Sequence, residues 1–181
     1  MINASTLTGK TAATSVASQR QDSRAGKYLT FFLGTEEYGI EILKVHEIIG
    51  LMPITPVPRT PDYIKGVINL RGKVIPTVDL RLKFGMEAVP HTEETCIIVV
   101  QTHGIEMGII VDKVSEVLNV GADDIEDTPS FGAAVNTDYI LGIGKGAGKV
   151  RLLLAIDKVL STQEIIEIHQ AENALGEETA S

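Results

Sequence analysis

The chain has 181 residues, of which 44% are hydrophobic, and its 24 acidic and 16 basic side chains give a formal net charge of −8. This acidic balance argues against binding to nucleic acid or free binding to anionic lipid, because both favour basic surfaces. The single cysteine excludes an internal disulfide and a CxxC metal site, and no apolar run is long enough to predict a membrane span. With no secretory leader pattern, we expect a soluble, cytoplasmic protein of one domain or two small ones.

The two ends of the chain differ from its middle. Residues 1–26 are rich in Ser, Thr and Ala and hold few large apolar side chains. Such a segment cannot bury enough apolar surface to offset the entropy lost on ordering, so we expect a disordered N-terminal arm. Residues 162–169 predict a short helix, and residues 169–181, which contain no Lys or Arg, predict an acidic C-terminal tail. The folded body is expected over residues 27–168.

The body has the patterns of β-strands. The predicted strands cover residues 28–33, 38–42, 67–70, 74–78, 95–102, 105–111 and 150–156. Apolar and polar side chains alternate in the second of them, as in a half-buried strand. Two pairs of strands flank tight turns, Arg71-Gly72 and His103-Gly104, and are typical of hairpins. Four prolines between residues 53 and 61 predict a loop.

A duplication relates the two halves of the body. Residues 38–49 align without gaps with residues 107–118. The identical pairs are Gly39/Gly108, Ile40/Ile109, Lys44/Lys113, Val45/Val114 and Glu47/Glu116. Two copies do not make a solenoid. We therefore predict a mainly β protein of two similar small β-barrel subdomains that pack on each other, because closing each sheet removes most exposed strand edges.

Patterns for phosphate or metal binding are incomplete. The four histidines are far apart in sequence, without the spacing of a metal site. The glycine-rich residues 142–149 lack the first glycine and the Ser/Thr of a Walker loop, and a strand follows them where an anion site needs a helix. We interpret this segment as a flexible hairpin loop. We expect no cofactor and no metal.

Catalytic patterns are missing as well. Cys96 opens an apolar strand without a neighbouring cation or base, so we interpret it as a small buried hydrophobic residue. Asp79, Asp112 and Asp157 each end a strand, where aspartate is typical of caps and turns. Because no nucleophile, base and orienting group occur together, we expect that the chain is not an enzyme.

Three blocks of the sequence resemble the CheW family of chemotaxis coupling proteins. They are Glu37-Tyr-Gly-Ile-Glu-Ile-Leu-Lys-Val-His-Glu-Ile48, Tyr63-Ile-Lys-Gly-Val-Ile-Asn-Leu-Arg-Gly72 and Pro76-Thr-Val-Asp-Leu80, and the resemblance spans residues 27–168. It implies two five-stranded barrels around a shared core, to which the residue pattern adds the short C-terminal helix over residues 162–169. It also implies a non-catalytic scaffold that couples the cytoplasmic tips of chemoreceptors to the regulatory domain of the histidine kinase CheA. Such a protein is cytoplasmic and is recruited to membrane-associated receptor arrays.

The resemblance also places candidate binding residues. In the family, receptor and kinase surfaces use a strand of the first barrel, the turn after it and an Asn-Leu-Arg-Gly turn. The matching positions are Ile42, Val45, Glu47, Asn69 and Arg71, and Phe131 matches a second kinase contact. From the residues alone, Ile42 and Val45 fit core packing equally well. Glu47 and Arg71 fit a mutually paired charge, and Phe131 fits a plug over the second barrel.

Other functions remain open at this point. One is an adaptor of a non-flagellar chemosensory pathway, and another is an enzyme that binds a small ligand between the barrels. A third is a small barrel that binds nucleic acid, but such barrels present basic grooves with stacking aromatic side chains. The chain has four Phe, four Tyr and no Trp, so its composition argues against this class.

Overall fold

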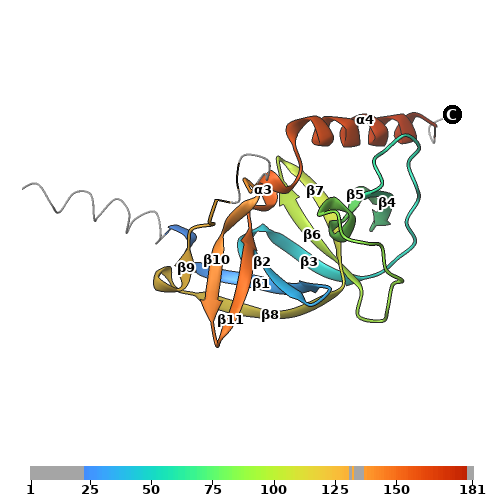
Figure 1. Cartoon of the computed structure of the whole chain (residues 1–181). Coiled ribbons are helices and arrows are strands. Elements are labelled where there is room, and N and C mark those ends of the chain that lie inside the picture. The colour runs from blue at the N-terminus through green and yellow to red at the C-terminus, as the bar shows by residue number, and fades with distance from the viewer. Residues whose placement is uncertain (1–22, 131, 133–136, 179–181) are drawn as a thin grey trace, which may run out of the picture.

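The computed structural model describes residues 23–130, 132 and 137–178 (Figure 1). The strands are β1 (Gly26–Leu33), β2 (Glu36–Glu41), β3 (Val45–Gly50), β4 (Ile64–Leu70), β5 (Lys73–Asp79), β6 (Cys96–Thr102), β7 (Ile105–Val111), β8 (Lys113–Val120), β9 (Ile125–Glu126), β10 (Ile140–Gly146) and β11 (Lys149–Leu154). The helices are the 3-10 turns η1 (Ile42–Lys44) and η2 (Ala122–Asp124), the short α2 (Leu80–Lys83) and α3 (Ile156–Val159), and α4 (Thr162–Glu178). The mainly β fold predicted from the sequence is confirmed.

The strands form two sheets, and each sheet combines both copies of the duplication. The first sheet has the order β8-β1-β2-β11-β10-β9 and the second the order β3-β6-β7-β5-β4. Figure 1 shows β1 and β2 (blue) beside β10 and β11 (orange), although these pairs are far apart in sequence. The parallel pairs β2–β11 and β5–β7 join the two copies. The two subdomains are therefore five-stranded units with exchanged strands, and the short β9 adds a sixth strand to the first.

The glycine shared by both copies lies at these parallel pairs. Gly39 pairs with Leu153, and Gly108 pairs with Thr77. A Cβ atom on Gly39 would lie 3.0 Å from Leu153 Cδ2, and one on Gly108 would lie 2.8 Å from Ile97 Cγ2. A side chain would therefore be tight at Gly39, against Leu153 on β11, and would displace Ile97 on β6 at Gly108.

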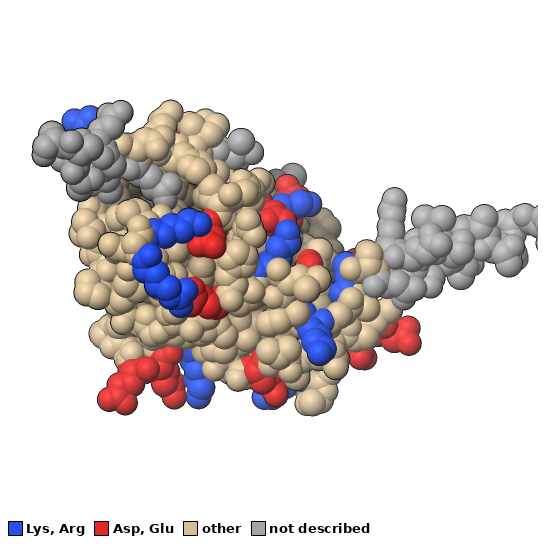
Figure 2. Space-filling view, turned by 180° about the vertical axis from the view of Figure 1, so that it is seen from behind, with Lys and Arg blue, Asp and Glu red and all other residues tan. Residues whose placement is uncertain are grey.

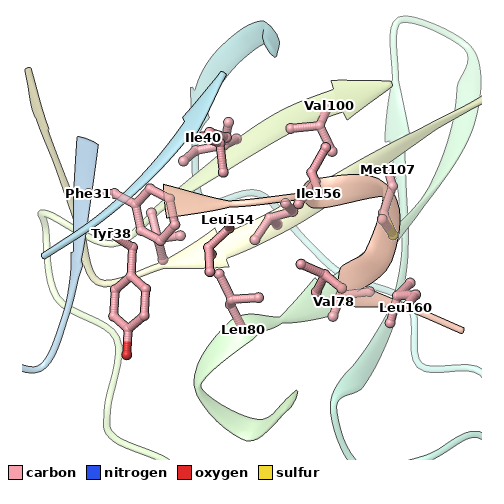
Figure 3. Close-up of a cluster of buried hydrophobic side chains, with 14 of the residues drawn as sticks. Phe31, Tyr38, Ile40, Val78, Leu80, Val100, Met107, Leu154, Ile156 and Leu160 are labelled. Carbon is pink, nitrogen blue, oxygen red and sulfur yellow. The ribbon is translucent and has the colours of Figure 1, made fainter. Parts of the chain in front are cut away.

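A shared apolar core lies between the two sheets. Figure 3 shows Phe31 and Ile40 of the first sheet pointing toward side chains of the second sheet and of α3. Two smaller clusters lie elsewhere, one in each sheet. Strand β6 contributes to both sides, because Ile98 belongs to the shared core and Ile97 to the cluster of the second sheet. Burial on both faces explains why its sequence is continuously apolar rather than alternating.

The interpretation of residues 142–149 as a flexible loop is wrong. Most of this segment belongs to β10 and the start of β11, and the turn between them is only Ala147-Gly148. The glycines have a packing role: a Cβ on Gly142 would lie 2.9 Å from Ile125 Cγ2 and 3.1 Å from the Glu126 carbonyl oxygen. A hairpin is present, as predicted, but glycine permits close strand contact here.

The three aspartates predicted to end strands do not share one role, and Asp157 lies in α3 rather than at the end of β11. Asp79 caps α2 by accepting a hydrogen bond from the Leu82 amide at 3.2 Å. Asp112 instead accepts hydrogen bonds from the Gly34 amide, at 2.7 Å, and from the Arg81 side chain. Asp157 accepts hydrogen bonds from the Lys44 ammonium and the Thr102 hydroxyl, both at 2.8 Å. The capping interpretation is therefore wrong for Asp112 and Asp157, which connect separate elements.

Both ends of the described body extend further than the sequence patterns indicate. Arg24, within the expected arm, lies 3.0 Å from the Asp127 carboxylate and donates a hydrogen bond to the Leu141 carbonyl oxygen. At the other end, α4 continues to Glu178, beyond the expected end at His169. The Ser161 hydroxyl and the Glu164 carboxylate form a reciprocal capping box at its start.

Candidate functional site

Two of the sequence-predicted residues meet at one end of the second sheet. Glu47 is on β3, and Arg71 is in the turn between β4 and β5. Arg71 Nη1 donates to Glu47 Oε1 at 2.9 Å, and Arg71 Nη2 donates to Glu47 Oε2 at 2.6 Å. This is a bidentate pair, which fixes the orientation of the guanidinium as well as its position. Because β3 and β4 are the two edge strands of the second sheet, the pair connects its edges.

The turn holds Arg71 in an unusual backbone conformation. Arg71 has a φ of 54°, in the left-handed region, and Gly72 follows with a φ of 85°. Asn69 stabilises this turn, since its Oδ1 accepts a hydrogen bond from the Gly72 amide at 2.8 Å. The Arg71 side chain is 73% exposed although both of its terminal nitrogens are bonded. The site thus presents an oriented cation to solvent.

The turn in the first sheet provides an internal comparison. The duplication places Ala147 and Gly148 at the positions of Arg71 and Gly72. Ala147 has a φ of 52°, so the same backbone turn forms without an arginine. Glu116 occupies the position of Glu47. The duplicated fold therefore repeats the turn and the glutamate but not the guanidinium.

More polar side chains surround the pair. Glu106, on β7, lies with Oε1 3.0 Å from His46 Nδ1 and with Oε2 3.2 Å from Lys73 Nζ. His46 Nε2 lies 3.0 Å from Gln101 Oε1. The hydrogen bond from Lys73, followed by the one from His46, holds the pKa of Glu106 below its ordinary value. We call these four residues and the Arg71–Glu47 pair the polar rim.

Sequence reasoning did not find four members of the polar rim. His46, Lys73, Gln101 and Glu106 come from β3, β5, β6 and β7, so no local motif joins them. Lys73, Gln101 and Glu106 lie at or near the ends of predicted strands, whereas His46 lies in β3, which the sequence patterns do not predict. Two exposed apolar side chains next to the rim residues were also missed, Ile48 and Val74.

The remaining candidate residues lie in different environments. Ile42 and Val45 are half-buried and pack against the shared core, as the core-packing alternative predicts. Asn69 is exposed in the turn. Phe131 lies outside the described residues. Of the predicted residues, only Glu47 and Arg71 belong to the polar rim. Asn69 stabilises the turn that carries Arg71, and Ile42 and Val45 pack against the shared core.

One surface hollow bears on the alternative that the chain is an enzyme. It has a volume of about 650 Å³ and is lined by residues that include Lys83, Tyr139 and Glu164. Lys83 Nζ and Glu164 Oε1 form an ion pair at 2.5 Å, so these charges neutralise each other. Cys96 is half-buried, and burial raises the pKa of its thiol, the opposite of what a nucleophile requires. The described residues contain no group of three His, Cys, Asp or Glu side chains placed to hold a metal.

Two further observations concern the binding of nucleic acid and the crossing of a membrane. Figure 2 shows basic and acidic side chains lying beside one another on the face seen from behind, without separation into one basic area. A nucleic-acid groove needs such an area. Within the described part of the chain, none of the helices is long and apolar enough to cross a membrane.

Comparison with known proteins identifies the family. The family model described as "CheW-like domain" matches residues 27–164. The chain belongs to the CheW-like family. A chemotaxis protein CheW of Klebsiella aerogenes is 44% identical over 139 residues, covering 77% of this chain and 84% of that protein. A chemotaxis protein CheW of Rhizobium meliloti is 36% identical over 150 residues, covering 78% of this chain and 97% of that protein.

A solved structure agrees with this assignment. The scaffolding protein TtCheW from Thermoanaerobacter tengcongensis has a TM-score of 0.71 and 34% sequence identity, and the match covers 77% of this chain and 95% of that one. This CheW-like chain is a non-catalytic adaptor of chemotaxis signalling. The resemblance recognised in the sequence is thereby confirmed, and a nucleic-acid-binding barrel or an enzyme is not favoured.

Proposed function

We propose that this CheW-like chain couples the cytoplasmic tips of chemoreceptors to the regulatory domain of the histidine kinase CheA. We further propose that the polar rim carries one of these two contacts. The observation that supports this most is the bidentate Arg71–Glu47 pair, which holds an exposed guanidinium at the tip of a hairpin. In this role the chain is recruited to membrane-associated receptor arrays.

The chemistry of Arg71 suits an interface. A guanidinium has five N–H donors, and the pair with Glu47 uses two of them. The remaining donors can bind carbonyl or carboxylate oxygens of a partner. Because Glu47 already restricts the side chain, binding costs less conformational entropy than it would for a free arginine. Arginine is also one of the residue types that dominate binding energy at interfaces.

The other candidate residues have supporting roles in this proposal. Asn69 holds the turn that presents Arg71, and Ile42 and Val45 anchor the segment before Glu47 to the shared core. The exposed Ile48 and Val74 supply apolar contact area next to the rim residues. Phe131 remains a prediction for a second contact with the kinase.

The test compares Arg71→Ala with the unaltered chain. Affinity is measured for a purified receptor cytoplasmic fragment and, separately, for the CheA regulatory domain. We expect Arg71→Ala to weaken one of the two affinities roughly 30-fold, as for an interface anchor. Arg71→Lys should restore the affinity only in part, because an ammonium lacks the planar fork. Folding should be preserved, since Ala147 adopts the same turn conformation in the first sheet.

Lys145→Ala is the matched control. Lys145 lies at the position of Asn69 in the other copy, and it pairs with Glu126 on the surface. The control removes one exposed positive charge and one ion pair near the equivalent turn of the first sheet. It should leave the affinity that Arg71→Ala weakens unchanged. Full affinity of a folded Arg71→Ala variant for both partners would remove the polar rim from the proposed contact.

A further inference from the structure

We infer that Glu106 is a positioning residue that holds the Arg71–Glu47 pair in its binding geometry. This inference rests on the proposed function of the polar rim and goes beyond it, because it gives a role to a residue outside the turn and outside β3. Glu106 lies on β7, in the middle of the second sheet, and its side chain is 24% exposed.

The contacts of Glu106 reach both sides of the pair. One carboxylate oxygen lies 3.0 Å from His46, the residue directly before Glu47 on β3. The other lies 3.2 Å from Lys73, two residues after Arg71 and the first residue of β5. A single carboxylate therefore fixes a neighbour of each member of the pair. With the Arg71–Glu47 bonds, these contacts close a ring of side chains over β3, β7 and β5.

A second contact tightens the ring on the side of Glu47. His46 lies at a bulge, where the register between β3 and β6 shifts between Val45 and Glu47. Its Nε2 atom lies 3.0 Å from Gln101 Oε1 on β6. Bulges redirect side chains locally. Each imidazole nitrogen thus has a side-chain oxygen of a neighbouring strand 3.0 Å away, which restricts the ring and the direction of the adjacent Glu47 side chain.

Arg71 needs this support for a physical reason. Isolated ion pairs at the surface contribute little, because two long side chains lose rotamer freedom and water screens the charges. Arg71 is mostly exposed and lies in a left-handed turn. A network of charges with fixed geometry is the exception to this weakness. Glu106 supplies the network, since it attaches the start of β5 and the bulge of β3 to the middle of the sheet.

The duplication indicates that this position is suited to such a role. Glu37 occupies the equivalent position in the first copy. There it lies 3.0 Å from Arg151 on the neighbouring parallel strand, and both side chains are buried. In each copy, therefore, a glutamate at this position contacts a basic side chain on the parallel strand that comes from the other copy. In the second sheet the glutamate is at the rim, beside the candidate contact.

The experiment is a double-mutant cycle with Glu106→Gln and Arg71→Ala. The probe is the partner fragment, receptor or CheA, whose affinity Arg71→Ala weakens. We expect Glu106→Gln to weaken binding roughly three- to tenfold when Arg71 is present and less than about twofold in the Arg71→Ala background. A loss of equal size in both backgrounds would overturn the inference, because it would show that Glu106 does not act through Arg71.

A second measurement does not depend on any partner. Nitrogen-15 relaxation of the Arg71 Nε–Hε group in the free chain reports whether the guanidinium is held. We expect an ordered group in the unaltered chain and a mobile one in both Glu106→Gln and Glu47→Gln. Glu94→Gln is the matched control, since it removes the exposed ion pair between Glu94 and Lys113 and should leave Arg71 ordered.

The two measurements separate failure of the inference from failure of the proposed function. If Arg71→Ala leaves both affinities unchanged, the proposed contact fails, and the relaxation of Arg71 still decides whether Glu106 positions it. If Arg71→Ala weakens binding but Arg71 stays equally ordered in Glu106→Gln, the contact stands and the positioning role is refuted.

Discussion

Replacing Arg151 by methionine should destabilise the fold strongly, because Glu37 would lose its partner inside the first sheet. The two side chains are only 8% and 6% exposed, and Arg151 Nε lies 3.0 Å from Glu37 Oε2. Glu37 is on β2 and Arg151 is on the parallel strand β11, so this pair joins the two copies of the duplication. The variant therefore tests the strand exchange on which the architecture depends.

The magnitude follows from the burial of both charges. Removing one partner of a buried ion pair costs about 3–5 kcal/mol, since the other charge loses both water and its partner. For a domain of this size, each 1 kcal/mol shifts the melting temperature by about 2–4 °C, so Arg151→Met should lower it by about 6–20 °C. Lys113→Met removes an exposed ion pair of the same sheet and should shift it by less than about 3 °C.

The combined variant Glu37→Leu and Arg151→Met provides the decisive comparison. Within the described residues, no acceptor is aligned for a hydrogen bond with Arg151 Nε, although Glu37 lies close to it. The pair therefore recovers little of its desolvation cost. Replacing both charges with apolar side chains should restore stability to within about 1 kcal/mol of the unaltered chain. Denaturant unfolding measures this, and a double variant less stable than Arg151→Met would refute the reasoning.

Three further predictions concern the fold. Gly108→Ala should lower the free energy of unfolding in denaturant by about 1–3 kcal/mol, because its Cβ would lie 2.8 Å from a buried Ile97 methyl group. Gly50→Ala, which has open space around it, should leave this free energy nearly unchanged. Burial acts to raise the pKa of Glu164, but hydrogen bonds, first of all from Lys83, lower it from 4.5 to about 2. Because the folded-state pKa is depressed, this stabilisation is present above about pH 4.5 and is lost as the pH falls toward 2. Unfolding of Glu164→Gln between pH 3 and 7 should show a smaller acid dependence, and an unchanged profile would contradict this. Deleting residues 1–22 should leave the melting temperature within about 2 °C. Deletion through residue 26 should lower it further, because it removes Arg24 and its bonds to Asp127 and Leu141.

Local patterns in the sequence predict much of the fold. Alternation in β2 and the turns at Arg71-Gly72 and His103-Gly104 are determined by neighbouring residues, so the corresponding strands and hairpins were predicted. The strand exchange was not. Equivalent strands of two similar copies present nearly the same side chains, so the sequence does not indicate which copy a strand joins. Strand β10 was missed because its glycines resemble a loop, whereas they allow close packing against Ile125.

The candidate site could be predicted only in part. Glu47 and Arg71 were found through family motifs, and their mutual pairing was one of two alternatives. Glu106, His46 and Gln101 meet because β3, β6 and β7 are neighbours in the sheet, a relation set by tertiary structure and not by spacing along the chain. The residue types of Glu106, His46 and Gln101 therefore do not by themselves mark them as parts of a site.

Reconstitution of kinase control tests the central claim most directly. Receptor-containing membranes and purified CheA are combined with the unaltered chain, with Arg71→Ala or with no adaptor, and CheA autophosphorylation is measured with and without a receptor ligand. We predict that receptor ligand changes the phosphorylation rate only when the unaltered chain is present, and that Arg71→Ala reduces this response at limiting adaptor concentration. Receptor control of CheA that is the same with and without the chain would contradict its role as a coupling adaptor.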